Sequence, residues 1–600
     1  MKLTGHAQSV TRILYKNSLS RFALSVLITI VAVSTALALT WPKLTAQAQV
    51  PGSPRVVTEM PWQFHRACIG NVLEVELDVG WLTTRTWQII PDDDLHSITI
   101  NDRAVSLQDV RPDGLRDYTY GFQIDLHEYL VEGHNHIVFH LDNHGGDGGL
   151  NMRPVLGMLR WSLISLAFLP LLLGLARLFH LHVIQSVVLC CGLIVLCCYW
   201  AATPWSMRSH DLGGGGHLEY IIYVANHHAL PNPMEGWTFY HPPVYYVLGA
   251  VIWTWAKSLS LPAPECIQAL SLALWLVFLA ASAGALRLTL RNRLSALFFA
   301  TAIVTFWPSG IIHGLRIGND AALYATVGVA TWFMVRWWQA RRRRHLWGFA
   351  AATALALLCK SNAMVLLGAG GLLLAFGFIS TLIHRKRQKW RNALIDLTIF
   401  SGVTGLGFAL SFAVRLYYFM HGDIKNWFIS NVDSLGGNLR VPVDAKSFLP
   451  LDIPTFLTQP WLETGNDATG RWNFWNYLMR SSLSGEFSFP SAWHRTLAIL
   501  WGIVLLALCL LALHRLANVL ARQRSFALYY RQLPWLLLTL LWIASLAALR
   551  VKAPFACSND FRYVLPVIVP AALCWAGCGP FTKFWMASMS LLSVIFFTTL

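Results

Sequence analysis

Between two strongly apolar segments of the chain, residues 205–246 read WSMRSHDLGGGGHLEYIIYVANHHALPNPMEGWTFYHPPVYY. This segment carries a carboxylate near its start, Asp211, followed by four glycines and a short amphipathic stretch that begins at His217. An ionisable group held at a membrane face by apolar flanks is a candidate functional group. The sequence therefore predicts a functional loop at a membrane surface, with the rest of the chain as its scaffold.

The composition is that of a membrane protein. Of the 600 residues, 55% are hydrophobic and only 13% are charged, whereas a soluble domain carries about 25% charged residues. The net charge of +16 does not indicate nucleic-acid binding, because the Lys and Arg residues cluster in short loops between apolar runs. That distribution is typical of the cytoplasmic loops of membrane proteins. We therefore predict a polytopic α-helical membrane protein.

Apolar runs predict roughly thirteen membrane spans, since each crossing needs about 20 residues. We expect them near 22–41, 157–176, 182–202, 265–286, 294–313, 319–338, 346–360, 361–382, 394–418, 494–516, 533–550, 560–578 and 583–600. Basic clusters at 287–293, 341–344, 385–391 and 515–531 should all be cytoplasmic. This order requires that residues 242–258 lie along the outer face as a juxtamembrane helix that begins after His241-Pro242-Pro243.

The chain divides into three predicted parts. Residues 1–50 form a cytoplasmic N-terminus and the first membrane helix. Residues 51–154 alternate apolar and polar side chains in segments such as LEVELDVG and SITINDRAVSL, which indicates a β-sandwich. Its pattern resembles the galactose-binding-like jelly roll, and we expect it on the outer side. Residues 155–600 form the transmembrane core, with outer loops at 203–264 and 419–493.

Two acidic residues are candidates for proton transfer. Asp211 is placed to accept a proton from a hydroxyl nucleophile, although an aspartate there is also an ordinary helix cap. Asp320 follows Asn319 at the outer start of a helix, where Asn and Asp are common N-caps.

Three basic residues are candidates for binding a phosphate. Lys360 lies in the apolar sequence LALLCKSNAMVLL, where a lysine is costly unless it is paired. Arg562 begins a helix at the outer face, and its planar guanidinium suits bidentate phosphate binding, with Asp560 as the competing partner. Arg316 precedes Asp320 and is expected to pair with that carboxylate or with a lipid phosphate.

The substrate cavity is expected to draw on polar and aromatic residues of the outer segments: His217, Glu219, Tyr220, His241, Asn319, Arg480, Glu486 and Tyr563. The first loop contains five histidines, but the chain has no HExxH motif. We assign no metal site and no cofactor, and leave a requirement for a divalent metal open. The chain also has no GxSxG, no Walker A motif and no GxGxxG after a strand, so no soluble nucleotide-sugar site is visible.

The order of these motifs resembles the GT-C superfamily of integral-membrane glycosyltransferases. It comprises DLGGGGHLEYIIYVANHHALP, YHPPVYYVL, GND, LLCKSNAMVLL and FRYVLP. The branch most similar is the one that holds the protein O-mannosyltransferases and the aminoarabinose transferases of lipid A. The resemblance covers roughly residues 157–600, and the inserted β-sandwich departs from that branch because it moves the first outer loop to a place after the third span.

The resemblance implies a function and residue roles. It implies transfer of a sugar from a polyprenyl-phosphate donor to an acceptor hydroxyl outside the membrane, with inversion at the anomeric carbon. Asp211 matches the catalytic aspartate of the first loop and Asp320 the second acidic position. Lys360 and Arg562 match basic residues that face the donor phosphate.

Partners and location follow from the same reading. We expect membrane lipids, a polyprenyl-linked donor and a lipid, glycan or protein acceptor, with no nucleic acid. The expected place is the bacterial inner membrane, with the site and the sandwich facing the periplasm. Two alternatives stay open. One is a polysaccharide polymerase or ligase that uses a polyprenyl-diphosphate glycan, and the other is a flippase or transporter without covalent chemistry.

Overall fold

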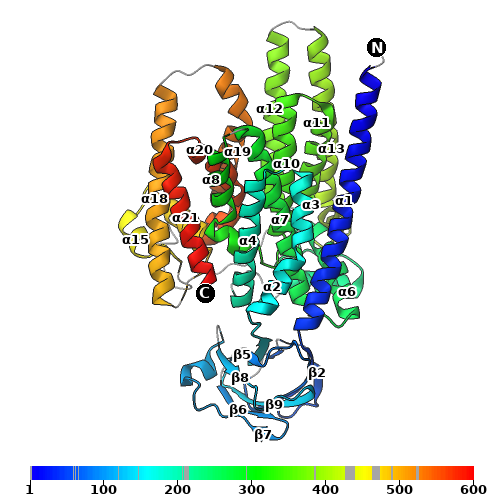
Figure 1. Ribbon diagram of the computed structural model, residues 1–600, viewed down its shortest axis with the longest axis vertical. Coiled ribbons are helices and arrows are strands. Elements are labelled where there is room, and N and C mark those ends of the chain that lie inside the picture. Colours follow the sequence, from blue (N-terminus) through cyan, green and yellow to red (C-terminus); the bar gives the residue numbers. More distant parts are fainter. Residues whose placement is uncertain are drawn as a thin grey trace.

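The computed structural model consists of a bundle of helices and, at one end of the bundle, a pair of small antiparallel sheets (Figure 1). The structure describes residues 3–58, 60, 62–64, 67–92, 94–118, 121–145, 148–205, 207, 215–291, 293–383, 387–425, 440–462, 473–487, 489, 491–521 and 526–600. The predicted base Asp211 lies outside these described residues.

The first helix runs directly into the sheets. Helix α1 (Leu3–Thr40) contains an apolar stretch, Ser20–Thr40, long enough to cross a bilayer, close to the expected span at 22–41. Strand β1 (Lys43–Gln49) follows after two residues. The sheets therefore begin ahead of residue 51, because the alternation of buried and exposed side chains already starts in the short sequence KLTAQAQ.

Residues 43–154, called the sandwich below, form two sheets. The strands are β2 (Val56–Thr58), β3 (Trp62–Phe64), β4 (Cys68–Val79), β5 (Thr86–Asp92), β6 (Asp94–Ile100), β7 (Arg103–Ala104), β8 (Phe122–Asp125), β9 (Gly133–Asn143) and β10 (Gly148–Pro154). One sheet has the order β2-β1-β4-β9-β6-β7 and the other β3-β10-β5-β8. Leu73 and Val75 of the first sheet share one apolar core with Trp87 and Leu150 of the second. The jelly-roll topology stays a prediction.

The core of the sandwich gives a first prediction. Trp87 on β5 is fully buried, whereas Trp81 in the β4–β5 turn is 78% exposed. Trp87→Ala should destabilise the sandwich by about 3–5 kcal/mol, because it removes a large buried side chain and leaves a cavity. Protease cleavage within 43–154 of the full chain in lipid nanodiscs, as a function of temperature, measures the loss. Trp81→Ala is the matched control, and equal sensitivity of both variants would contradict the assignment of the core.

The helical bundle contains the following helices: α2 (Met158–Ala167), α3 (Leu169–Leu178), α4 (Val183–Ala202), α5 (His217–His227), α6 (Val244–Ser258), α7 (Ala263–Leu290), α8 (Leu294–Thr305), α9 (Pro308–His313), α10 (Asp320–Ala340), α11 (Arg343–Cys359), α12 (Met364–Ile383), α13 (Arg387–Met420), α14 (Ala445–Phe448), α15 (Ile453–Thr458), α17 (Phe474–Ser484), α18 (Ala492–Ala521), α19 (Phe526–Lys552), α20 (Ile568–Ala576) and α21 (Pro580–Thr598).

Within the described residues, nine stretches are long and apolar enough to cross a membrane, so the chain is a multi-pass membrane protein. They are Ser20–Thr40, Arg160–Leu178, Val183–Ala202, Ala263–Leu290, Ser361–Ile383, Trp390–Met420, Ala492–Arg515, Tyr530–Lys552 and Pro580–Thr598. The C-terminal end of α12 and the N-terminal end of α13 lie at the end of the bundle away from the sheets (Figure 1). These helix ends and the sandwich therefore lie at opposite ends of the bundle.

Four of the roughly thirteen expected spans are not among these nine. The segment 294–313 divides into α8 and α9, because Pro308 cannot donate a backbone hydrogen bond to the preceding turn. The segment 560–578 begins with the short 3₁₀ turns η6 (Phe561–Tyr563) and η7 (Leu565–Val567) and continues as a short α20. The segments 319–338 and 346–360 form α10 and α11, which fall short in hydropathy or length.

Helix α6 occupies the position predicted for a juxtamembrane helix. It has 15 residues, so at about 1.5 Å per residue it reaches roughly 22 Å, less than the roughly 30 Å of a hydrocarbon core. It packs against α5 and α7 and lies at the end of the bundle nearest the sheets (Figure 1). That the helix stays outside the bilayer remains a prediction.

Candidate functional site

The hairpin of α10 and α11 brings two of the predicted site residues together. Because the two helices are antiparallel neighbours, the start of α10 lies beside the end of α11. Lys360, which follows α11, donates a hydrogen bond from Nζ to Oδ1 of Asp320 at 2.6 Å. The side chains are only 6% and 14% exposed, so this is a buried ion pair. Each charge in such a pair depends on the other, because neither is solvated by water.

Asn319 lies in the turn before Asp320 and is fully buried. Its Nδ2 donates to the carbonyl of Cys359 at 3.2 Å, which fastens the start of α10 to the end of α11. Its Oδ1 has no hydrogen-bond partner among the described residues. A buried acceptor of this kind needs an explanation, and one explanation is a ligand or water that completes the site.

A second ion pair faces the first from the turn before α20. Arg562 Nε lies 3.1 Å from Oδ2 of Asp560, and Oδ1 of Asp560 accepts the backbone N–H of Arg562 at 3.0 Å. The hydroxyl of Tyr324 on α10 donates to the carbonyl of Arg562 at 2.7 Å, which ties this turn to α10. Asp560 is fully buried, and it is the competing partner that the sequence indicated.

Tyr563 lies between the two cations. Lys360 Nζ is 5.2 Å from the centre of its ring and Arg562 Cζ is 4.9 Å from it. Both distances are in the range in which a cation interacts with an aromatic face. Arg562 Nη2 also donates to the Tyr563 hydroxyl at 3.1 Å. Two cations that are 202 residues apart in the sequence are therefore held against one ring.

The loop of residues 203–264 contacts the start of α10 through His217. A Cβ atom added to Gly318 would lie 3.4 Å from Cδ2 of His217, so the imidazole packs on the residue that precedes Asn319. Two tyrosines of α6 stabilise this contact: Tyr245 bonds to Gly318, and Tyr246 bonds to His217. The backbone N–H of Gly318 donates to the Tyr245 hydroxyl at 3.0 Å, and His217 Nδ1 lies 2.8 Å from the Tyr246 hydroxyl.

An aromatic stack continues from His217 into the loop. The imidazole ring of His217 is nearly parallel to that of His241, with 5.9 Å between the ring centres. The rings of Tyr220 and Tyr246 are stacked, with their centres 3.8 Å apart. Burial, together with the positive charges of Lys360 and Arg562, holds the pKa of His241 well below its usual range. His241 is therefore neutral at pH 7, and it lies within the field of the two cations. Glu219 follows in the first turn of α5 and is half-buried.

Arg316 lies at the edge of this cluster. Its Nη1 is 3.0 Å from Nδ1 of His313, and its guanidinium lies 5.3 Å from the ring of Phe487. The charges of Arg316, Arg562 and Lys360 all act on His313, so the three cations belong to one electrostatic cluster. Asp320 and Asp560 are its carboxylates.

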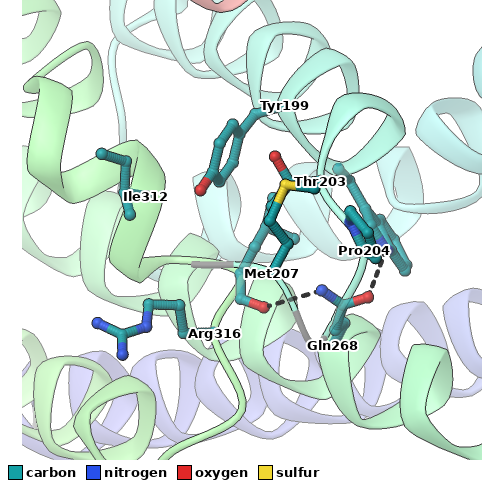
Figure 2. A pocket seen from close by; sticks show the side chains of 9 residues that line it. Tyr199, Thr203, Pro204, Met207, Gln268, Ile312 and Arg316 are labelled. Atoms are coloured by element: carbon teal, nitrogen blue, oxygen red, sulfur yellow. Dashed lines mark hydrogen bonds between the residues drawn. The ribbon is translucent and has the colours of Figure 1, made fainter. Parts of the chain in front are cut away.

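Arg316 also lines a small hollow between α4, α7 and the chain around α9 (Figure 2). Its walls are Tyr199, Trp200, Thr203, Pro204, Met207, Gln268, Ile312, Leu315 and Arg316. Gln268 accepts a hydrogen bond from Trp200 Nε1 at 2.8 Å and donates to the carbonyl of Leu315 at 3.5 Å. The hollow has room for about one water molecule. It is therefore too small for a sugar in this state of the protein.

The loop residues Arg480 and Glu486 lie around α17. Arg480 is fully buried and its Nη2 lies 3.5 Å from the carbonyl of Thr455 on α15. Glu486 accepts a hydrogen bond from the hydroxyl of Tyr477. Helix α17 reaches the cluster through Ser481, whose hydroxyl accepts the backbone N–H of Phe561 at 3.0 Å. Arg480 of α17 therefore lies against α15, and Ser481 of the same helix lies against the turn that carries Arg562.

Asp211 itself is not described, but both ends of its loop are. Met207 lines the hollow beside Arg316. Gly215 accepts the backbone N–H of Thr238 at 2.9 Å, with φ of +79° and no room for a Cβ atom against Gly236.

The sequence did not indicate several residues that build the site. Gly318, His313, Tyr245, Tyr246 and Tyr324 supply its contacts. Tyr245 and Tyr246 lie in the quoted segment after His241-Pro242-Pro243, so their position was a usable signal. Within the part of the chain that the structure describes, no group of three His, Cys, Asp or Glu side chains is arranged to hold a metal ion.

Comparison with known proteins gives distant structural likenesses. No family model matches the chain, and no curated protein matches it. Among solved structures, the chain is similar to the arabinosyltransferase EmbB from Mycobacterium smegmatis, with 11% identity and a TM-score of 0.37 over 94% of this chain and 54% of that one. The chain thus spans about half the length of EmbB.

The chain is also similar to ArnT from Cupriavidus metallidurans. The structure bound to undecaprenyl phosphate gives 16% identity and a TM-score of 0.31 over 65% of this chain and 77% of that one. The apo structure of ArnT from the same organism gives 18% identity and a TM-score of 0.29 over 67% of this chain and 76% of that one. Because identities and TM-scores are this low, the function of the chain has to be argued from its own residues.

Proposed function

We propose that the protein is a membrane glycosyltransferase that moves a sugar from a polyprenyl-phosphate donor to an acceptor hydroxyl on the outer face of the membrane, with inversion. The proposal places the chain in the bacterial inner membrane, with the sandwich and the site in the periplasm. The observation that carries it is the pair of cations, Lys360 and Arg562, that lie 5.2 and 4.9 Å from the centre of the Tyr563 ring, with Lys360 directly before the apolar stretch Ser361–Ile383.

The charge balance of the cluster supports binding of an anion. Among the described groups, the cluster holds three cations, Arg316, Lys360 and Arg562, and two carboxylates, Asp320 and Asp560. Cations that are largely removed from water are stabilised by an anionic ligand. A lipid phosphate supplies a negative charge and keeps its hydrocarbon tail in the bilayer, beside the apolar stretch Ser361–Ile383 that follows Lys360.

The same cations suit the chemistry of sugar transfer. When the bond between the anomeric carbon and the phosphate oxygen breaks, negative charge grows on the leaving phosphate. Fixed cations in a site with little water stabilise that charge in the transition state more than they do in solution. We propose that Lys360 and Arg562 have this role and that Asp320 holds Lys360 in place through its 2.6 Å hydrogen bond.

Asp211 is the proposed general base. The acceptor hydroxyl must lose a proton as its oxygen bonds to the anomeric carbon, and a carboxylate within hydrogen-bond reach can take it. Asp320 is less suited to that step because its carboxylate is engaged by Lys360. Gly215 and His217 fasten the far end of the Asp211 loop next to Gly318, which supports a location for Asp211 near the cations.

The reaction itself is tested by transfer with purified protein. The full chain in nanodiscs is incubated with undecaprenyl phosphate that carries a radiolabelled sugar, and with envelope extract from a strain that lacks the gene. Mass spectrometry of envelope lipids and glycans with and without the gene product identifies the acceptor. The radiolabelled sugar should appear on components of the envelope extract only when active protein is present. Glycosylation patterns that are identical in both strains, together with no transfer in vitro, would overturn the proposal.

A prediction for Arg562 tests the donor site. Arg562→Ala should raise the apparent KM for the polyprenyl-phosphate sugar by about 10- to 100-fold, because a charge-assisted hydrogen bond to a phosphate contributes about 1.5–3 kcal/mol. Initial rates at varied donor concentration measure it. Arg343→Ala is the matched control, since Arg343 pairs with Asp396 and is 43% exposed. An effect on the acceptor KM alone would contradict the phosphate role.

A further inference from the structure

The sandwich is fastened to the bundle by a buried arginine at the end of its last strand. Arg153 on β10 is 7% exposed, and its Nη2 donates to the carbonyl of Ala201 at 2.9 Å. The strand holds the backbone of Arg153 opposite Gln88 of β5. A side chain that belongs to the sandwich therefore reaches the last turn of α4 in the bundle.

The charge of Arg153 has a partner in the bundle as well. Glu265 lies in the first turn of α7 and is 9% exposed, and the two charges attract each other. The second terminal nitrogen of Arg153, Nη1, is buried with no hydrogen-bond partner among the described residues. Two opposite charges that are both removed from water attract each other, and loss of one leaves the other uncompensated.

Ala201 is the point at which α4 turns into the first outer loop. The N–H of Thr203 donates to the carbonyl of Trp200 at 3.3 Å, and the N–H of Met207 donates to that of Pro204 at 3.1 Å. Thr203, Pro204 and Met207 then line the hollow beside Arg316 (Figure 2). The contact of Arg153 with Ala201 thus fixes the start of the segment that leads to Asp211.

A second arginine joins the same two parts without touching this loop. Arg160 on α2 donates from Nε to the carbonyl of Leu82 and from Nη2 to that of Thr83, at 2.8 Å for the second bond. Both acceptors lie in the turn between β4 and β5. Arg153 and Arg160 therefore both hold the sandwich on the bundle, but Arg153 is the one of the two that bonds to the end of α4.

We propose that Arg153 is a positioning residue through which the sandwich holds the start of the first outer loop in its working place. The sandwich then acts as a structural part of the sugar-transfer site rather than as a separate binding module. The role in transfer rests on the proposed function, whereas the effect on the loop does not.

Hydrogen exchange tests the effect on the loop. In Arg153→Gln, the amides of Thr203 and Met207 should exchange at least about tenfold faster, because the charged hydrogen bond to Ala201 is lost. Arg160→Gln, the matched control, should leave them unchanged. The double variant Arg153→Gln/Glu265→Gln removes the uncompensated carboxylate and should show the same fast exchange. Wild-type exchange at both amides in either Arg153 variant would overturn the proposal.

Kinetics tests the role in transfer. In Arg153→Gln, kcat should fall by about tenfold or more while the KM for the undecaprenyl-phosphate sugar stays within twofold, because the cations are untouched. Arg153→Lys should recover part of kcat, since it keeps the charge without the planar fork. Fast exchange with an unchanged kcat would overturn the positioning role. If wild-type protein transfers no sugar, the proposed function fails, and the exchange result still decides whether the sandwich holds the loop.

Discussion

Replacement of Asp211 by asparagine should lower turnover by about 10²- to 10⁴-fold, the range that a positioned general base contributes. Asparagine has nearly the same shape as aspartate but cannot take the proton from the acceptor hydroxyl. The cations that hold the donor are unchanged, so the affinity for the polyprenyl-phosphate sugar should stay the same. Single-turnover transfer and donor binding, measured on the same nanodisc preparation, separate the two quantities.

Glu235→Gln is the matched control for Asp211→Asn. Glu235 lies in the same outer loop and is exposed, so it tests whether any loss of a carboxylate there lowers turnover. Full activity of Asp211→Asn would remove this residue as the base. The same conclusion would follow if a cysteine at position 211 were labelled only from the cytoplasmic side, because the acceptor is proposed to lie outside.

Replacement of Lys360 by methionine should have two large effects. It leaves Asp320 buried without its partner, and breaking a buried pair in this way costs about 3–5 kcal/mol of stability. It also removes a cation from the leaving phosphate, which should lower turnover by about 10²-fold or more, as loss of one transition-state contact does. Thermal unfolding of the nanodisc-embedded chain measures the first effect, and transfer at saturating donor measures the second.

The double variant Lys360→Met/Asp320→Asn distinguishes the two effects. With both charges gone, no uncompensated carboxylate remains, so most of the stability should return. Turnover should remain low, because the phosphate still lacks its cation. Recovery of turnover together with stability would show that Lys360 has only a structural role, and would remove the main support for the proposed donor site.

The fold could be predicted from the sequence where one physical pattern dominates a segment. Long apolar runs such as Ser20–Thr40 and Val183–Ala202 form helices long enough to cross a membrane. The alternation in LEVELDV forms a strand of a sheet. The number of spans stays a prediction where local chemistry interrupts such a run. Pro308 ends the run from residue 294, and the segment from 560 begins with short turns, which apolar content alone does not reveal.

The site could be predicted only in its residue types. A lysine in an apolar run, an arginine at a helix start and an aspartate after Asn319 each stand out, because such groups are costly near a membrane. Their partners do not stand out. Lys360 meets Asp320 across 40 residues, and Tyr324 meets Arg562 across 238. No local pattern encodes such contacts, and Arg153 of the sandwich was not singled out at all.

The sequence by itself determined that the chain lies in a membrane, that it carries an inserted segment of strands, and that a few polar groups lie between or within its apolar segments. These properties follow from the transfer of each side chain between water and lipid, which depends on residue type and on its neighbours along the chain. The tertiary structure alone decided which charges meet. Pairing depends on how antiparallel helices and the sandwich pack, and so only the packed structure joins Lys360 to Asp320, His217 to Gly318 and Arg153 to Ala201.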